Sequence, residues 1–336
     1  MQLAAMHRNL MRTRIRAGRV FHATRSSFET EFANAPQPVQ NEPLDRYINR
    51  PGKRVVRFRW RASLDSRSKS TIVLGAGWTC HPGMYTPVIP ALNRKHALLT
   101  IENAGHWNSP LGNSTPTTYL NDLALDANAV LDLERVERVV LVGHSMWGFA
   151  ARKFALEHPD KTAGIVFMCA PFANPLETWI FGNGRTMDTV LRSISYAIQI
   201  GGPAVDVIKR LLADNPILRE LVRASLEEMS GKRLNGNFDK FFYNVMRTNS
   251  KTFSIAFRAM LLEKIDELTQ LGKLSIPILV ITGESDLIVS SSAWSDVVRK
   301  LPNARLIELP VGHLPTMEAP EETIRLIDEF VRSCKF

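Results

Sequence analysis

One ten-residue segment, Val139–Gly148 (VVLVGHSMWG), constrains the fold of this chain more strongly than any other. Its first four residues are apolar and aliphatic, which is typical of a strand covered on both faces of a sheet. Gly143 follows directly, and residues 148–158 have the pattern of a helix. A buried strand that turns within a few residues into a helix predicts that Ser145, in the turn, projects its hydroxyl group from the carboxyl edge of the sheet.

Strand and helix patterns alternate at short intervals on both sides of this segment. The expected strands are short apolar or alternating runs at 54–61, 71–74, 97–101, 163–169, 277–281 and 305–309. The expected helices between and after them are 117–133, 293–301 and 320–332. Such alternation predicts the α/β class, with a mostly parallel sheet formed by right-handed crossovers and with helices on both of its faces.

The alternation stops between residues 172 and 271, where the recognisable segments all have a helical pattern. These segments are 187–200, 204–212, 216–229, 238–248 and 252–268. We therefore expect one α/β core, formed by residues 51–171 and 272–336, with residues 172–271 inserted as a helical cap. The polar residues 29–50 contain three prolines and are expected to form a linker.

The formal net charge of +9 is concentrated at the amino-terminal end. Residues 1–28 contain six arginines and no acidic residue, and the rest of the chain carries 36 basic and 33 acidic residues, a balance of only +3. Because these charges nearly cancel, the rest of the chain does not have the basic surface of a nucleic-acid-binding protein, and no nucleic-acid partner is expected. No run reaches the roughly 18 apolar residues of a membrane-spanning helix, so no transmembrane segment is expected either.

Residues 1–28 have the composition of a mitochondrial targeting leader. They are rich in arginine, contain serine and threonine, and lack acids. Apolar residues recur in them at near-helical spacing, namely Leu3, Met6, Leu10, Met11 and Ile15. We expect a mitochondrial location; the alternative is a basic tail without structure on a cytoplasmic protein.

The cysteine and glycine patterns predict neither a metal nor a cofactor. Cys80, Cys169 and Cys334 are odd in number and widely spaced, so they indicate no disulfide framework and no Cys-x-x-Cys site. No other group has the spacing of zinc ligands, and no glycine-rich loop has the pattern that cradles phosphate groups. All three thiols are expected to be free.

The segment Gly143–Gly148 (GHSMWG) resembles the GHSMGG motif of the α/β-hydrolase superfamily, with Trp147 in place of its second glycine. In that superfamily the serine is followed along the chain by an acid and then by a histidine. Residues 277–286 (PILVITGESD) resemble the family's acid-bearing strand, and residues 311–320 (VGHLPTMEAP) resemble its histidine loop. The resemblance implies an α/β-hydrolase sheet with an inserted helical cap.

The resemblance also implies a catalytic triad of Ser145, Asp286 and His313, the last two being 27 positions apart. Ser145 would attack a carbonyl carbon, His313 would pass the serine proton to the leaving group, and Asp286 would orient the imidazole. Glu284 is an alternative acid, although it lies two positions before the matching residue. The strand at 163–169 ends without a carboxylate, which removes the family's other acid position.

Two backbone N–H groups are needed to stabilise the oxyanion that forms during acyl transfer. The residue after the serine, Met146, supplies the first in this fold. By the resemblance, Gly77-Trp78 occupies the place of the family's His-Gly-x turn, so that Trp78 supplies the second. Ala76 stands where the family usually has the histidine of that turn.

Two tryptophans depart from the family pattern at turns where close approach of the backbone favours glycine. Trp147 lies in the nucleophile elbow, residues 143–148. Trp107 lies in residues 102–109, a loop that resembles the family's D-x-x-G-x-G-x-S with Glu102 in place of aspartate. Either both indoles are accommodated and shape the pocket, or the elbow is distorted and the fold serves binding alone.

The expected function is hydrolysis of a carboxylic ester or thioester through an acyl-enzyme on Ser145. Aromatic residues and a methionine in the cap favour a lipophilic small molecule, although such residues more often form a core; they are Phe238, Phe241, Phe242, Tyr243, Met246, Phe253 and Phe257. The alternatives are an acyltransferase or lyase on the same fold, and a catalytically weak or inactive hydrolase-like binding protein. The sequence leaves the oligomeric state open.

Overall fold

The structure is a computed structural model that describes residues 45–174, 248–286 and 288–336, together with single residues and short stretches between 200 and 224. The leader expected at residues 1–28 lies outside the described residues, as do most of the linker and most of the cap.

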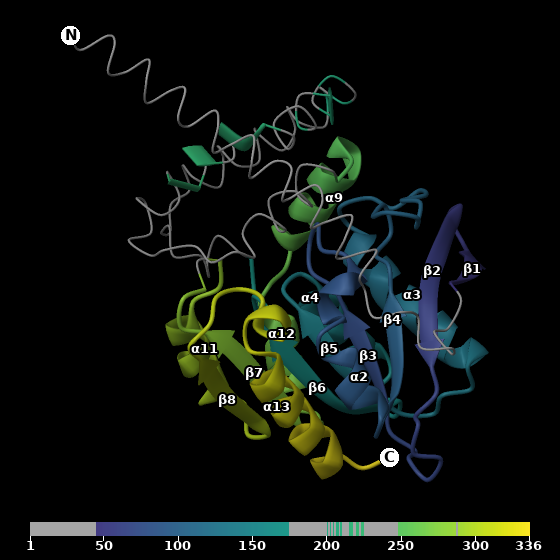
Figure 1. The fold of residues 1–336 in the computed structure, drawn as a ribbon, viewed down its shortest axis with the longest axis vertical. Coiled ribbons are helices and arrows are strands. Elements are labelled where there is room, and N and C mark those ends of the chain that lie inside the picture. The colour runs from purple at the N-terminus through teal and green to yellow at the C-terminus, as the bar shows by residue number, and fades with distance from the viewer. Residues whose placement is uncertain are drawn as a thin grey trace, which may run out of the picture.

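The core is one eight-stranded sheet with the strand order β1-β2-β4-β3-β5-β6-β7-β8 (Figure 1). The strands are β1 (Arg46–Arg50), β2 (Arg54–Arg61), β3 (Thr71–Gly75), β4 (Ala97–Ile101), β5 (Val139–His144), β6 (Thr162–Met168), β7 (Ile278–Gly283) and β8 (Ala304–Leu309). β2 pairs antiparallel with β1 and with β4, and every other neighbouring pair is parallel. The expected mostly parallel sheet is confirmed.

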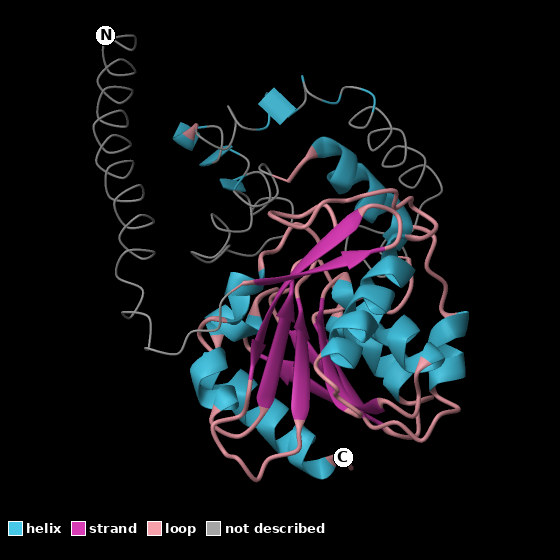
Figure 2. Ribbon diagram, turned by 90° about the vertical axis from the view of Figure 1, so that its right-hand side faces the viewer, coloured by secondary structure: helices cyan, strands magenta, loops and turns pink. Residues whose placement is uncertain are grey.

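Helices cover both faces of this sheet (Figure 2). They are η1 (Pro82–Tyr85), α2 (Ile89–Asn93), α3 (Tyr119–Leu133), α4 (Trp147–Glu157), α9 (Ser250–Met260), α10 (Asp266–Leu271), α11 (Ser291–Val298), α12 (Pro315–Glu318) and α13 (Pro320–Ser333). One apolar cluster packs α3, α4, α10 and α11 on one face and extends to α9. A second cluster packs η1, α2 and α13 against the other.

The central strands are apolar because both of their faces are covered. Every residue of β3, β5, β6 and β7 is buried, so their sequences are continuous apolar runs rather than alternating ones. β1, at one edge of the sheet, is mostly exposed. The arrangement explains why the central strands could be located from the sequence more easily than the edge.

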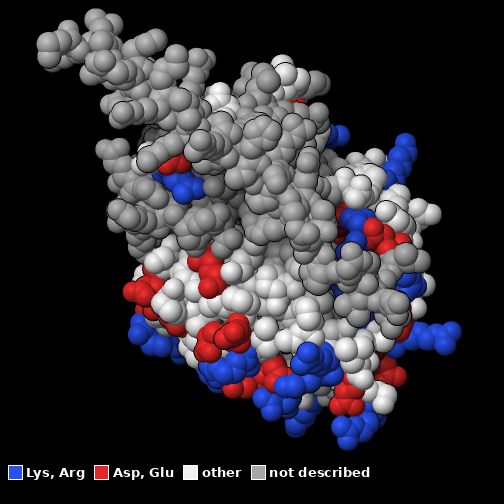
Figure 3. Space-filling model, in the orientation of Figure 1, with Lys and Arg blue, Asp and Glu red and all other residues white. Residues whose placement is uncertain are grey.

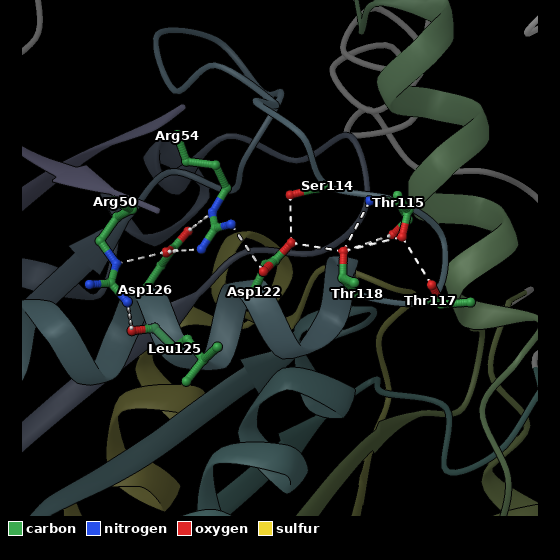
Figure 4. Close-up of polar contacts among 9 residues, drawn as sticks. All are labelled: Arg50, Arg54, Ser114, Thr115, Thr117, Thr118, Asp122, Leu125 and Asp126. Atoms are coloured by element: carbon green, nitrogen blue, oxygen red, sulfur yellow. Dashed lines mark hydrogen bonds and ion pairs between the residues drawn. The ribbon is translucent and has the colours of Figure 1, made fainter. Parts of the chain in front are cut away.

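The linker expected at residues 29–50 is wrong in its last part, because Arg46–Arg50 forms β1. The strand is too polar to show a strand pattern. Ile48 packs against the apolar core, and ion pairs tie the hairpin of β1 and β2 to α3. Arg50 and Arg54 each lie 3.0–3.1 Å from Asp126 on α3, and Arg54 lies 3.0 Å from Asp122 (Figure 4). Asp122 in turn accepts a hydrogen bond from Ser114.

The single helix expected at 252–268 is also wrong, because the chain forms α9 and then, after a break, α10. Glu263 lies in the break and pairs with Arg152, which extends from α4. The chain therefore turns at Glu263 instead of continuing the helix. A polar contact between distant elements sets this boundary. The helical periodicity of the sequence does not predict such a contact.

The parallel strands bring several loops to one edge of the sheet. The loops after β3, β5, β6 and β7 lie at its carboxyl edge, where clefts form in open α/β sheets. α9 lies above this edge in both ribbon views (Figures 1 and 2).

On the face drawn in Figure 3, basic and acidic side chains are interspersed without a large patch of one sign. In the described part of the chain, no helix has the length and hydropathy that a membrane span requires.

Candidate active site

Ser145 lies in a strained turn between β5 and α4. Its φ angle is +51°, in the left-handed region that costs a non-glycine residue roughly 1 kcal/mol. Two backbone hydrogen bonds hold it there: its N–H donates to Met168 over 3.0 Å, and its carbonyl accepts from Gly148 over 2.9 Å. The side chain is half-buried, at the carboxyl edge of the sheet. The turn therefore has the strand–turn–helix geometry that the sequence predicts.

Both glycines of the elbow are required by close packing. A Cβ atom on Gly143 would lie 2.8 Å from Cα of Gly148. A Cβ atom on Gly148 would lie 2.5 Å from Cβ of Ala170. Both distances are shorter than carbon atoms tolerate, so a side chain at either position would push the turn apart.

Trp147 is accommodated because a third glycine makes room for it. Its indole is only 1% exposed and packs over Gly75, the last residue of β3. A Cβ atom on Gly75 would lie 1.9 Å from Cδ2 of this indole. The side chain therefore packs into the core beneath the turn, while Ser145 keeps its left-handed conformation. The distorted elbow expected as one of two outcomes is not observed.

Trp107 is accommodated differently, on the surface. Its side chain is 51% exposed and meets the ring of His81 edge to face at 4.8 Å. Its φ angle of +48° lies in the left-handed region, which glycine adopts without strain. The same loop is closed by Glu102, which accepts a hydrogen bond from the N–H of Asn108 over 3.0 Å.

The expected acid and histidine lie together. Nδ1 of His313 donates to Oδ2 of Asp286 over 2.8 Å. The other carboxylate oxygen of Asp286 accepts from the N–H groups of Ile288 and Val289. Burial by itself would raise the pKa of Asp286, but His313 and these two N–H groups lower it below its ordinary value. Asp286 is thus suited to remain ionised and to orient the imidazole.

Glu284, the alternative acid, is exposed, whereas Asp286 is buried and accepts the hydrogen bond from the His313 ring. The difference follows from the end of β7, where the N–H groups of Glu284 and Ser285 still bond to β8 and its loop. The chain turns inward only at Asp286, whose N–H bonds to Gly283.

Two residues without an assigned role in the sequence hold the loop of His313. Nε2 of His144 donates to the His313 carbonyl over 2.8 Å, and burial lowers the pKa of His144 to about 3, so this ring is neutral. Glu318 accepts from the N–H groups of Gly312, at 2.6 Å, and Leu314, at 3.1 Å. The motif contained the signal for His144, directly before Ser145; the function of Glu318 depends on the folded loop.

The structure brings His313 beside the elbow without a hydrogen bond to its serine. The rings of His144 and His313 lie 4.8 Å apart between centroids. Within the described residues, neither the hydroxyl of Ser145 nor Nε2 of His313 forms a hydrogen bond. Such a bond is frequently long without substrate and shortens in the reacting complex.

The turn after β3 lies directly against Ser145. A Cβ atom on Gly77 would lie 2.8 Å from Cβ of Ser145. The N–H groups of Trp78 and Met146, the two expected oxyanion donors, form no hydrogen bond to an acceptor in the described part of the chain. Trp78 lies in the turn after β3 and Met146 in the elbow beside Ser145, so both N–H groups can donate to a ligand bound at the serine.

A second loop fixes the position of this turn. Asn103 donates to the carbonyl of Ala76 over 2.8 Å. Nε2 of His106 accepts the N–H of Thr79 over 3.2 Å, and its Nδ1 faces the carbonyl of Ala104. His106 has no functional pattern in the sequence, and the structure gives it this positioning role.

Helix α9 contacts the same turn through aromatic rings. The indole of Trp78 lies 4.3 Å from the ring of Phe253 and 5.2 Å from that of Phe257, between centroids. On the other side, Gly105 lies so close to α9 that a Cβ atom on it would be 2.3 Å from Oγ1 of Thr252. An apolar surface therefore adjoins the serine on the side of α9.

These features define a protein of the α/β-hydrolase class, and the comparison of sequences agrees. Residues 72–326 match the model of the Alpha/beta hydrolase family, a range that includes Ser145, Asp286, His313, Trp78 and Met146. The chain belongs to this family.

Individual relatives are distant but match over most of their length. An uncharacterized hydrolase, YugF, from Bacillus subtilis is 26% identical over 268 residues, which is 79% of this chain and 90% of that protein. A pimeloyl-[acyl-carrier protein] methyl ester esterase from Aeromonas hydrophila is 23% identical over 77% of this chain and 94% of its own. A solved hydrolase structure from Pseudomonas aeruginosa has a TM-score of 0.67 at 20% identity, covering 87% and 99% of the two chains. The sequence relatives support a hydrolase.

Proposed function

We propose that this chain is a serine hydrolase that cleaves a carboxylic ester or thioester through an acyl-enzyme on Ser145. The observation that carries the proposal is the left-handed Ser145 at the same sheet edge as the hydrogen-bonded Asp286–His313 pair. A metal-free acyl transfer needs a nucleophile, a base and a group that orients the base, and these three side chains supply them.

In the proposed reaction His313 accepts the proton of Ser145 at Nε2 while the serine oxygen attacks the carbonyl carbon. The N–H groups of Trp78 and Met146 stabilise the oxyanion of the tetrahedral intermediate. His313 then donates its proton to the leaving alcohol or thiol, which leaves the acyl group on Ser145. A water molecule, deprotonated by the same imidazole, releases the acid. Asp286 remains ionised throughout and stabilises the imidazolium.

The substrate is proposed to be a small ester or thioester with a lipophilic acyl group. Trp78 belongs to the turn against Ser145, and its indole stacks with Phe257 and contacts the tilted ring of Phe253, both of α9. The remaining aromatic residues of the cap that the sequence suggested, Phe238 to Met246, lie outside the described residues. The relative named as a methyl ester esterase supports the ester class without identifying the acid.

The test is hydrolysis of p-nitrophenyl esters of graded chain length. We expect a measurable rate that rises with acyl length and is abolished by Ser145→Ala. Ser68→Ala is the matched control, because Ser68 precedes β3 at the opposite edge of the sheet. Equal activity in Ser145→Ala and the unaltered protein would exclude the proposed nucleophile. No activity with any ester would favour the binding-protein alternative. The two tryptophans do not support that alternative, because both are accommodated.

For residues 1–28 we propose mitochondrial targeting, on their arginine-rich, acid-free composition. A fusion of residues 1–35 to a fluorescent reporter is expected to enter mitochondria. Replacing the six arginines by glutamine should return the reporter to the cytosol. A uniformly cytosolic reporter on the unaltered leader contradicts the proposal.

A further inference from the structure

A thiol lies beside the Asp286–His313 pair and takes no part in the proposed reaction. Cys169 follows β6 directly, is fully buried and has a φ angle of +45°. Its N–H donates to the carbonyl of Ile281 on β7 over 2.7 Å. The left-handed turn after β6 thus directs the chain across the end of β7, where Asp286 lies. Sγ of Cys169 also contacts the carbonyl of Gly312, the residue before His313, at 3.7 Å.

Three different metal-ligating groups meet at this point. One ligand atom each of Cys169, Asp286 and His313 lies within 4.8 Å of the other two. Thiolate, carboxylate and imidazole are the ligands that bind zinc in proteins. A tetrahedral zinc ion with ordinary bond lengths separates its ligand atoms by roughly 3.3–3.6 Å. The pair at 2.8 Å would have to open by about half an ångström, and the thiol, which lies within 4.8 Å of both, to approach by at most about 1.5 Å.

We propose that Cys169, Asp286 and His313 form an inhibitory site for a borderline-soft divalent cation, with Zn²⁺ as the prototype. Binding releases the thiol proton of Cys169 to solvent. The ion takes the place of the hydrogen bond between the two other residues, so Nδ1 of His313 becomes a ligand and its proton moves to Nε2. The metal retains an open position for water.

Inhibition follows from the tautomer that the ion imposes. An imidazole that carries its proton on Nε2 and a metal on Nδ1 has no lone pair for the proton of Ser145. The loss of activity rests on the proposed function, because it requires His313 to be the base. The binding of the ion does not rest on it.

The burial of the three side chains predicts how the ion enters, and their ligand atoms predict which ions bind. The side chain of His313 is 12% exposed, whereas those of Cys169 and Asp286 are buried. An ion must therefore pass the imidazole, and inhibition should develop slowly rather than on mixing. Mg²⁺ and Ca²⁺ prefer oxygen ligands and should not bind, whereas Co²⁺ is a zinc substitute with a visible spectrum.

The first experiment measures binding without activity. The full chain, freed of metal by a chelator, is titrated with Co²⁺, and the thiolate-to-cobalt charge-transfer absorption is recorded. We expect the band in the unaltered protein and in Ser145→Ala, with Zn²⁺ displacing Co²⁺. Cys169→Ala should lose the band and bind Zn²⁺ more weakly by about 100-fold or more, since loss of outer-shell partners alone costs 10–100-fold. Cys80→Ala, at another buried thiol, is the matched control and should keep both.

The outcomes separate the site from the reaction. The band in the unaltered protein, lost only in Cys169→Ala, supports the site even when no ester is hydrolysed. Binding of Co²⁺ without a thiolate band, or a band that persists in Cys169→Ala, overturns it. Where ester hydrolysis is measurable, Zn²⁺ should slow it progressively and a chelator should restore it. The ratio of rates with and without Zn²⁺ should be near one in Cys169→Ala; an equal ratio in both proteins would also overturn the proposal.

Discussion

Gly75 lies outside every motif, yet it is what allows Trp147 to occupy the elbow. The family motif has a glycine at the position of Trp147. The indole here needs a neighbour without a side chain, and Gly75 is that neighbour. Ser145 keeps its left-handed φ angle because Trp147 is displaced into the core and not toward the serine. The site therefore depends on its glycines, which lack a Cβ atom, as much as on its functional groups.

Gly75→Ala is predicted to destabilise the protein by about 1–3 kcal/mol, since its Cβ overlaps the indole of Trp147. The same change in a Trp147→Gly background should cost much less, because the overlapping ring is gone. Urea unfolding of the four proteins in this double-mutant cycle measures the coupling between the two positions. Additive costs would show that Gly75 and Trp147 do not compete for the same space.

Asp286→Asn is predicted to lower kcat by about 10⁴-fold, because the amide no longer fixes the imidazole tautomer that accepts the serine proton. Glu284→Gln is the matched control, a carboxylate two positions away that is exposed, whereas His313 bonds to Asp286. It should leave kcat within about twofold of the unaltered enzyme. The reverse pattern in steady-state ester hydrolysis would assign the acid to Glu284.

Some site residues could be predicted from the sequence and some could not. Ser145, Asp286 and His313 could be predicted because each follows the end of a strand in a recognisable local pattern. The three patterns also occur along the chain in a fixed order. The functions of His106 and Glu318 depend on contacts between loops, which no spacing encodes. The same holds for Cys169, which the sequence presents only as one of three unrelated thiols.

At the scale of elements, α4 joins the elbow to both ends of the cap insertion. Its Arg152 is 1% exposed, donates to the carbonyl of Phe172 over 2.7 Å and pairs with Glu263 at 2.5 Å. Glu263 in turn accepts the N–H of Asn174 through its backbone carbonyl. The chain leaving the core toward the cap and the chain returning from it are thus held together by the helix that begins at the elbow.

Arg152→Met is predicted to cost about 3 kcal/mol, because it leaves the carboxylate of Glu263 buried with Lys153 as its remaining partner. Replacing Glu263 by Met as well should recover most of that loss, since the unpaired charge is then absent. Chemical unfolding of both variants measures the difference. A double variant less stable than Arg152→Met alone would show that the carboxylate is not the source of the cost.

The elements that the sequence located best are those whose burial is complete. β3, β5, β6 and β7 are continuous apolar runs, and α13 has a clear apolar stripe. β1 and the break between α9 and α10 were missed because charged residues determine them. Arg50 in the first case and Glu263 in the second pair with residues far along the chain.

At the scale of the whole molecule, stability is predicted to fall in mild acid. Burial lowers the pKa of His106 to about 4 and that of His144 to about 3, whereas both rings have a pKa of about 6.5 in the unfolded chain. Below about pH 6.5 the unfolded chain therefore binds more protons than the folded one. Each ring then contributes a loss of up to about 1.4 kcal/mol for every unit the pH falls, until its folded pKa is reached.

The measurement is the free energy of unfolding between pH 7 and pH 4.5. His106→Asn, which cannot be protonated, should lower the slope of stability against pH by about the contribution of one group. If the two rings were instead charged and paired in the fold, stability would rise as the pH falls. Parallel curves for the two proteins would show that His106 does not carry the effect.

The proposed hydrolase activity depends on Ser145 being an activated nucleophile in the folded chain. The most direct measurement is mass spectrometry of the native protein after reaction with a fluorophosphonate, followed by digestion to locate the adduct. One adduct is predicted, on the peptide that contains Ser145; it should be absent in Ser145→Ala and form far more slowly in His313→Gln. Folded protein that stays unlabelled, or that carries the adduct on another residue, would contradict the assignment of Ser145 as the nucleophile.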